Sequence, residues 1–235
     1  MNTKILSRSI LGFLACVALF FAFSASNEPV IGFLRGSSVE HKLHALHYEN
    51  AIVFNFAIAY LVSLMFWVLI VYIPDRQVRR ILKNNLSLRY QAFKEDTIDI
   101  LVLGCKDTEG IQLSRVLSHH ITFREFFNAS NKYRWYEVMN YLEANPQKLD
   151  DVRNQLQFLV DEIAYVLSKV NFDEPHVHAF FRWLCVQVNR LKQDSNYSHE
   201  QVKYYGRFLW KIFTGWDRVD GYSAEDVIKK MIFKI

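Results

Sequence analysis

The sequence predicts an all-α protein in which a two-helix transmembrane hairpin is followed by a compact helical cytoplasmic domain. Two stretches near the start of the chain contain no charged residue, and they are long enough to be membrane spans. Beyond them, apolar residues recur at helical spacing. The 235 residues include only 8 Gly and 4 Pro, so no long flexible linker is expected.

The first apolar stretch, residues 10–26, reads ILGFLACVALFFAFSAS. A span needs about 20 apolar residues to cross the hydrocarbon layer, so this stretch is just long enough. We expect a cytoplasmic N-terminus at 1–9 and transmembrane helix 1 at 10–26. The alternative is a cleaved signal peptide, because Lys4 and Arg8 precede the apolar run and the small residues Ser24-Ala25-Ser26 end it. The sequence leaves both interpretations open.

The second apolar stretch, residues 51–73, is comfortably long and predicts transmembrane helix 2. Its single amide, Asn55, lies near one end, and Tyr72 is typical of an interfacial aromatic belt. Residues 27–50 then form a periplasmic loop. Four of its side chains are possible zinc ligands, namely Glu40, His41, His44 and His47. A solvated histidine-containing loop is the simpler interpretation, so we predict no metal site and no cofactor.

Basic residues set the orientation of the hairpin. Directly after the second span the chain carries Arg76, Arg79, Arg80 and Lys83, against Asp75 alone among nearby acids. The excess of basic residues places residues 74–235 in the cytoplasm, and Lys4 and Arg8 place the N-terminus there too. The odd, dispersed cysteines suit a reducing compartment: Cys16, Cys105 and Cys185. We therefore expect a multi-pass protein of a bacterial inner membrane.

The same basic residues predict a contact with the membrane surface. Arg76, Arg79, Arg80 and Lys83 fall at i, i+3, i+4 and i+7, so a helix presents them on one face. Each basic side chain near anionic headgroups contributes about 1 kcal/mol of attraction. We predict that these four bind the membrane surface. The alternative is that they only set topology.

The cytoplasmic region reads as a series of amphipathic helices. The first is 76–103, with an apolar side made of Val78, Ile81, Leu82, Leu86 and Phe93. A strand at 98–103 that opens a nucleotide-binding fold is an alternative, but we favour a helix that ends near Gly104, where glycine relieves the left-handed cap. Asn145-Pro146 predicts the start of a helix with a strong apolar repeat. Ser223 and Asp226 form a capping pattern for the last helix. The remaining helices are expected at 111–119, 122–128, 132–144, 175–192, 198–213 and 224–235.

Residues 201–218 combine a core stripe with a basic face. The core stripe consists of Val202, Tyr205, Leu209, Ile212, Phe213 and Trp216. Lys203, Arg207 and Lys211 recur every four residues, with Tyr204 beside them. Cations meet phosphates and rings stack on unpaired bases, so this pattern suits nucleic acid, although it also suits a protein partner or a solvated face. We predict a partner or nucleic-acid site at Lys203, Tyr204, Arg207 and Lys211.

Signatures of enzymes are missing from the sequence. It contains no phosphate-binding loop, no zinc-binding H-E-x-x-H helix and no G-x-S-x-G nucleophile elbow. Cys185 is a possible nucleophile with His176 and His178 nearby, but it lies in an apolar run that predicts a buried, inert thiol. The pair His119-His120 lacks further ligands at metal-binding spacing. We therefore predict that the protein is not an enzyme.

These features together carry a resemblance. The chain has a short charged N-terminus, an apolar hairpin that ends in Tyr72-Ile73-Pro74-Asp75-Arg76, and a helical domain without catalytic motifs. This layout resembles the small two-transmembrane effector proteins of bacterial phage-defence systems, including those encoded beside retron reverse transcriptases.

The resemblance implies a toxin-like effector that acts in abortive infection. A reverse transcriptase with its branched RNA–DNA molecule would keep it silent, and release would let it oligomerise and damage the inner membrane. Small residues that suit lateral helix contacts are Gly12, Ala15, Cys16, Ala57 and Ser63. The alternative function is a non-toxic anchor or scaffold that recruits a soluble complex to the membrane.

Overall fold

The described chain divides into two compact units, Met1–Val78 and Arg79–Ile235. The computed structural model describes residues 3–25, 51–105, 113–128, 134–195, 201–217, 221–223 and 225–235. The predicted periplasmic loop, 27–50, lies outside these residues, and so do its candidate zinc ligands Glu40, His41, His44 and His47. The described parts are nearly all helical, in agreement with the predicted class.

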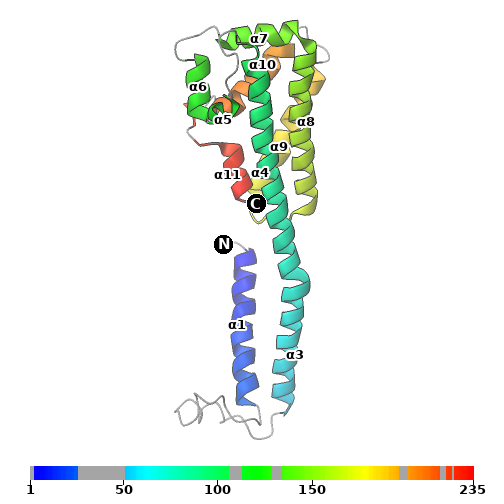
Figure 1. Cartoon of the computed structure of the whole chain (residues 1–235). Helices are drawn as coiled ribbons and strands as arrows, with labels where there is room; N and C mark the ends of the chain where they lie inside the picture. Colours follow the sequence, from blue (N-terminus) through cyan, green and yellow to red (C-terminus); the bar gives the residue numbers. More distant parts are fainter. Residues whose placement is uncertain are drawn as a thin grey trace. The chain divides into compact units, whose positions relative to one another are not determined.

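The first unit is built from two helices that pack side by side (Figure 1). They are α1 (Thr3–Ser24) and α3 (Ala51–Trp67). The buried residues of this unit are small: Ala18, Ala22, Ser24, Ala25 and Ala57. Small side chains let helix backbones approach closely, which explains the contact. Ala57, predicted to face another copy, therefore packs within the unit, whereas Cys16 and Ser63 are exposed.

Among the described residues, one helix is long and apolar enough to cross a membrane. It runs without a break from Ala51 to Val102, and only 6% of its apolar window is buried. The apolar helix within α1, Ser9–Ser24, falls short of a full span. The second predicted crossing therefore stays a prediction, and so does the orientation of the termini.

The apolar helix contains a π-helical turn, Val68–Tyr72, between α3 and α4 (Ile73–Val102). The N–H of Ile73 donates to the carbonyl of Val68, five residues back. The next residue, Pro74, has no N–H to offer the preceding turn, so the ordinary ladder is interrupted at this point in any case. The wider turn brings the rings of Trp67 and Tyr72 into a stack with centroids 5.8 Å apart.

The second unit is a helical domain (Figure 1). It also contains a small antiparallel β-hairpin. After α4 its helices are α5 (Ser114–Leu117), α6 (His120–Asn128), α7 (Arg134–Ala144), α8 (Pro146–Lys169), α9 (Pro175–Ser195), α10 (Gln201–Thr214) and α11 (Val227–Phe233). The strands β1 (Trp216–Asp217) and β2 (Gly221–Tyr222) pair antiparallel, with Trp216 opposite Tyr222. This hairpin is the departure from the predicted all-helical domain.

The core of this domain is continuous from α4 to α11. Phe93 of α4 stacks on Phe213 of α10 at 5.8 Å, and Phe123 of α6 lies 5.0 Å from the same ring. The predicted apolar side of α4 was partly wrong, because Val78 and Ile81 are exposed. The buried face follows Leu82, Leu86, Tyr90, Phe93, Thr97, Ile98 and Leu101.

The helix predicted after Asn145-Pro146 is confirmed. It is α8, and it buries Val152, Leu156, Leu159, Ile163 and Val166, as its apolar repeat predicts. Pro146 occupies the first turn, where its missing N–H costs nothing. The side chain of Asn145 does not cap α8, however. Its amide donates to the Tyr141 carbonyl at the end of α7, so it closes the preceding helix instead.

The end of the chain is organised by Gly215 and Asp226. Gly215 has a φ of 65°, and a Cβ there would lie 2.8 Å from both His120 Nδ1 and the Ser223 carbonyl. Only glycine fits this turn without strain. The predicted cap of the last helix was wrong: α11 begins three residues later than expected, and Asp226 is its N-cap, accepting the Lys229 N–H. Ser223 accepts the N–H of Glu225 within the preceding turn.

Candidate functional site

The second unit contains a large open groove between α7 and α10. Its volume is about 1230 Å³. Apolar and aromatic side chains make up most of its lining, which comprises Phe127, Trp135, Tyr136, Met139, Asn140, Leu142, Glu143, Pro146, Leu149, Gln201, Val202, Lys203, Gly206, Arg207, Trp210 and Trp216. Figure 1 shows α7 crossing one end of the domain beside α10.

The floor of the groove exists because α7 and α10 meet at a glycine. Gly206 is buried on α10, and a Cβ at this position would lie 2.3 Å from the sulfur of Met139 on α7. Any larger residue would push Met139 aside. Gly206 therefore lets the two helices approach closely, while the flexible methionine fills the contact.

Three rings of the lining form a cluster of edge-to-face contacts. Trp135 and Trp210 meet edge to face with centroids 5.0 Å apart, and Phe127 meets Trp135 at 5.4 Å. Such contacts hold aromatic rings in fixed orientations. Two further aromatic residues of the groove point into solvent: Tyr136 is 68% exposed and Trp216 is 39% exposed.

The sequence-predicted partner site is only partly brought together. Lys203 and Arg207 are exposed on α10 and line the groove, whereas Glu143 is the acidic side chain of the lining. Tyr204 is exposed but does not line the groove. Lys211 is half-buried, with its ammonium 5.8 Å from the ring centre of Trp183. Two of the four predicted residues thus belong to the groove.

The predicted membrane-surface residues also divide into two pairs. Arg79 and Lys83 are half-buried and contact their own domain. Arg79 donates to the carbonyl of Asn171 at 2.7 Å and lies 3.3 Å from the carboxylate of Asp173. Lys83 donates to the carbonyl of Phe233, the last residue of α11. Arg79 and Lys83 therefore stabilise the helical domain in addition to contributing positive charge.

Arg76 and Arg80 are exposed on α4. Of the predicted stripe, they are the side chains best placed to meet a charged surface. They would attract a lipid headgroup, a phosphate or an acidic partner. For anionic lipid headgroups this attraction is about 1 kcal/mol per basic side chain.

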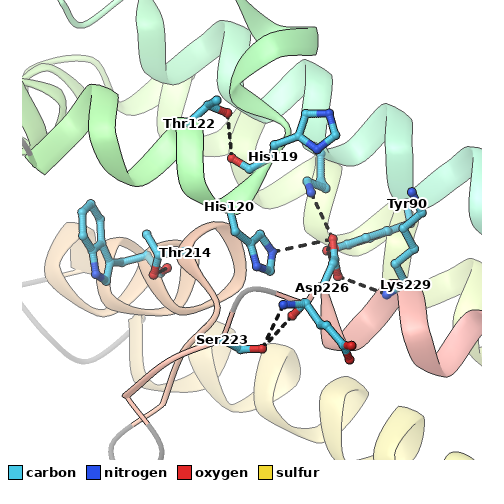
Figure 2. A network of polar contacts seen from close by, with 11 residues as sticks. Tyr90, His119, His120, Thr122, Thr214, Ser223, Asp226 and Lys229 are labelled. Atoms are coloured by element: carbon cyan, nitrogen blue, oxygen red, sulfur yellow. Dashed lines mark hydrogen bonds and ion pairs between the residues drawn. The ribbon is translucent and has the colours of Figure 1, made fainter.

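A buried polar network ties α4, α6 and α11 together (Figure 2). Asp226 lies at its centre. The hydroxyl of Tyr90 donates to both of its oxygens at 3.0 Å, and the ammonium of Lys94 donates to Oδ2 at 3.0 Å. His120 Nε2 lies 3.6 Å from the same oxygen. The side chains of Tyr90, Lys94 and His120 are almost wholly buried.

Burial and neighbouring charges set the protonation of this network. For Asp226, burial alone would raise the pKa, but the charge and hydrogen bond of Lys94 and the Lys229 N–H outweigh it, so its pKa is lowered. Burial lowers the pKa of His120, although Asp226 opposes this effect. Burial and the Asp226 charge raise the pKa of Tyr90 well above its usual value. At neutral pH the network thus holds one buried ion pair with a neutral imidazole and a neutral phenol.

The other nucleophile and metal candidates do not gather into a site. Burial raises the pKa of the Cys185 thiol, so it is protonated at neutral pH. His176 pairs with Glu174 at 3.0 Å, and His178 packs against Phe172. His119 is exposed while its neighbour His120 is buried. In the described part of the chain, no group of three or more His, Cys, Asp or Glu side chains could hold a metal ion.

Comparison with known proteins gives no match: no family model, no curated protein sequence and no solved structure is similar to this chain. The function is therefore inferred from the geometry of the described residues.

Sequence reasoning missed both the groove and the network. The groove joins α7 to α10, which are far apart in sequence, and its walls include Trp135 and Tyr136, two adjacent aromatic residues on a short helix. Adjacent residues on a helix point about 100° apart, and here Trp135 is half-buried while Tyr136 is 68% exposed. Asp226 was singled out as part of a capping pattern, and no local pattern links it to Lys94 or Tyr90.

Proposed function

We propose that this protein is a membrane-anchored effector. A cytoplasmic partner binds its helical domain and keeps it inactive, and the protein disrupts the membrane when the partner dissociates. The observation that carries the proposal is the exposed apolar helix. Its large side chains face outward: Ile52 is 74% exposed and Phe56 is 76% exposed. Water disfavours such a surface strongly, whereas hydrocarbon accepts it.

The helical domain supports the partner half of the proposal. The α7/α10 groove is far larger than a packing defect and is rich in Trp, Tyr, Met and Arg. These residues are enriched at the energetic centres of protein interfaces. A domain that offers a preformed groove and no clustered catalytic groups among its described residues is suited to being bound.

The membrane half includes the second crossing and the lateral assembly. In this proposal α1 and α3 form a hairpin in the bacterial inner membrane, with both chain ends in the cytoplasm. Among the described residues, no neighbouring side chain or other segment lies within 4 Å of where a Cβ of Gly12 would be, and Cys16 and Ser63 are exposed, which supports contacts with another copy. When the partner dissociates, the equilibrium shifts from the dispersed protein toward the assembled oligomer.

The resemblance to retron-associated effectors extends the proposal to a specific partner. It would be a reverse transcriptase with its RNA–DNA molecule, which infection displaces. In that case the protein serves abortive infection, since membrane damage stops growth before phage matures.

The test is expression of the full chain without its genomic neighbours. We expect a voltage-sensitive dye to report depolarisation and growth to stop, and co-expression of the neighbouring genes to restore both. A matched control is the chain with Ile58→Arg and Val62→Arg in α3, which should not insert and should leave cells healthy. Intact membranes at an expression level verified in the membrane fraction would refute the effector. If a neighbour-encoded complex still co-fractionates with the membrane, the scaffold is the function.

A further inference from the structure

We propose that the α7/α10 groove binds an amphipathic, acidic α-helix of a protein partner, with the acidic side of that helix against Lys203 and Arg207. This inference rests on the proposed function only for the idea that a partner exists, and it names the chemistry of that partner. It also decides between the protein and nucleic-acid partners that the sequence leaves open.

The charges around the groove argue for a protein. Lys203 and Arg207 line one edge, on α10, and Glu143 lines the other, on α7. The described residues of the lining therefore carry a net charge of about +1. A single strand of nucleic acid needs a continuous positive track along its phosphates. A helix with acidic residues on one flank and a basic or neutral residue on the other complements both edges.

The aromatic rings point to the same occupant. Nucleic-acid bases need exposed ring faces on which to stack. Tyr136 and Trp216 are exposed at the groove, but the other three rings of its lining meet edge to face: Trp135 and Trp210 at 61°, and Phe127 and Trp135 at 82°. Rings held in this way present edges and apolar side walls, which suit aliphatic side chains.

A helix fits better than an extended segment because of the backbone. Both long walls of the groove are helices, and their N–H and C=O groups are used within α7 and α10. An extended peptide would find few backbone partners and would leave its own polar groups unpaired. A helix satisfies its backbone internally and needs only side-chain contacts, as in other helix-in-groove complexes.

The size of the groove is consistent with this occupant. A helix about 11 Å in diameter with a rise of 1.5 Å per residue occupies about 140 Å³ per residue. A groove of about 1230 Å³ then accommodates about nine residues, or two and a half turns. Such a helix would present apolar residues at i, i+3, i+4 and i+7 to the Met139–Gly206 floor.

The experiment selects binders for the groove without assuming a partner. The full chain in nanodiscs is presented to a display library of random 16-residue peptides, and enriched peptides are measured by fluorescence anisotropy. We expect enrichment of peptides with the helical apolar repeat flanked by Asp or Glu. Their affinity should fall by about tenfold or more with Lys203→Glu and Arg207→Glu combined.

Matched variants separate the groove from general effects. Arg182→Glu with Arg190→Glu makes the same charge change on exposed residues of α9, and should leave peptide affinity unchanged. Tyr136→Ala removes an exposed ring of the groove and should weaken binding about tenfold, whereas Tyr165→Ala removes an exposed ring elsewhere and should not. All four are surface changes that leave the core intact.

Three outcomes would overturn the inference. The first is no enrichment, or enrichment of peptides without the acidic helical pattern. The second is binding that is indifferent to the Lys203→Glu and Arg207→Glu pair. The third is tight binding of a labelled 20-nucleotide oligo-dT that this pair abolishes, which would assign the groove to single-stranded nucleic acid. None of these readouts depends on membrane damage, so the effector proposal and this inference fail separately.

Discussion

The helices α3 and α8 place their apolar residues in opposite environments. α3 is apolar all round, yet its only buried residue is Ala57. α8 buries seven residues along one stripe, and its remaining positions carry many charges. Each pattern is internally consistent. The apolar residues of α8 are buried by the protein itself, whereas those of α3 are left exposed by the described residues, as in a helix that could cross a membrane.

The comparison teaches that the same degree of exposure has different meanings in the two units. Leu88 on α4 is 59% exposed, more than Ile58 or Val62 on α3. A single exposed leucine on a folded domain is normal and needs no explanation. A whole helix of such residues indicates a membrane or a large interface. Each prediction below tests one side of this contrast.

The largest effect is expected when charge enters α3. Ile58→Arg with Val62→Arg should cost about 5–7 kcal/mol of insertion free energy, since each arginine at the centre of a span costs about 2.5–3.5 kcal/mol. Leu88→Arg, at a more exposed position of the helical domain, should change stability by about 0.5 kcal/mol or less. Carbonate extraction followed by immunoblotting measures insertion, and Leu88→Arg should stay in the membrane pellet like the unchanged chain. If the double variant stays in the pellet as fully as the unchanged chain, and a reporter after Ile235 keeps its accessibility, α3 does not carry the insertion.

The next effect concerns the centre of the buried network. Asp226→Ala should lower the free energy of unfolding by about 3–5 kcal/mol, because it leaves the buried ammonium of Lys94 without its counter-ion. Urea unfolding of the full chain in mild detergent, followed by tryptophan fluorescence, measures the loss. The exposed neighbour Glu225, changed to Ala, is the control and should have a much smaller effect.

A second variant tests the reason for that loss. Lys94→Met combined with Asp226→Leu removes both charges together and should recover much of the stability. If the double variant is as unstable as Asp226→Ala alone, the cost comes from the lost N-cap of α11 and the lost acceptor of the Tyr90 hydroxyl rather than from the unpaired charge.

The helical elements could be predicted because their signals are local. The Pro146 start and the apolar repeat of α8 depend on residues within a few turns of one another, and the structure confirms both. Where the prediction failed, a tertiary contact overrode a local pattern. Ser223 matched a capping box, but Asp226 took the N-cap because its carboxylate also binds Lys94 and Tyr90 from α4.

The candidate site could be predicted only in part for the same reason. Periodicity placed Lys203 and Arg207 on the outer face of α10, and they are exposed there. It could not show that α7 lies beside them, because that depends on the close approach of Gly206 and Met139. Likewise the basic stripe after the span was visible, but not that Arg79 and Lys83 face their own domain.

That division of the basic stripe gives a third prediction. Arg79→Ala should lower the free energy of unfolding by about 1.5–3 kcal/mol, since it removes charge-assisted bonds to Asn171 and Asp173. Arg80→Ala should leave stability within about 0.5 kcal/mol. It should instead weaken binding to vesicles of anionic lipid by about 1 kcal/mol. Thermal unfolding measures the stabilising role of Arg79, and vesicle co-sedimentation measures the lipid-binding role of Arg80. Equal effects of the two variants in both assays would contradict this separation of roles.

The smallest effect is a pH dependence of the stability of the helical domain. The pKa of His120 is lowered by burial, so the unfolded chain binds a proton at mildly acidic pH that the folded chain excludes. Stability should therefore fall as pH drops below about 6.5, by up to about 1.4 kcal/mol per pH unit. Asp226, whose pKa is lowered, stays ionised through this range, and its contribution is lost only below about pH 4. The charges of Lys94 and exposed His119 also act on His120 and favour its neutral form.

The variant His120→Gln tests this cause. It should remove the loss of stability between about pH 7 and 5, while the loss below about pH 4 that comes from Asp226 remains. An unchanged profile in this variant would place the titrating group elsewhere, and a steeper fall would mean that the protonated imidazole is stabilised by Asp226 rather than excluded.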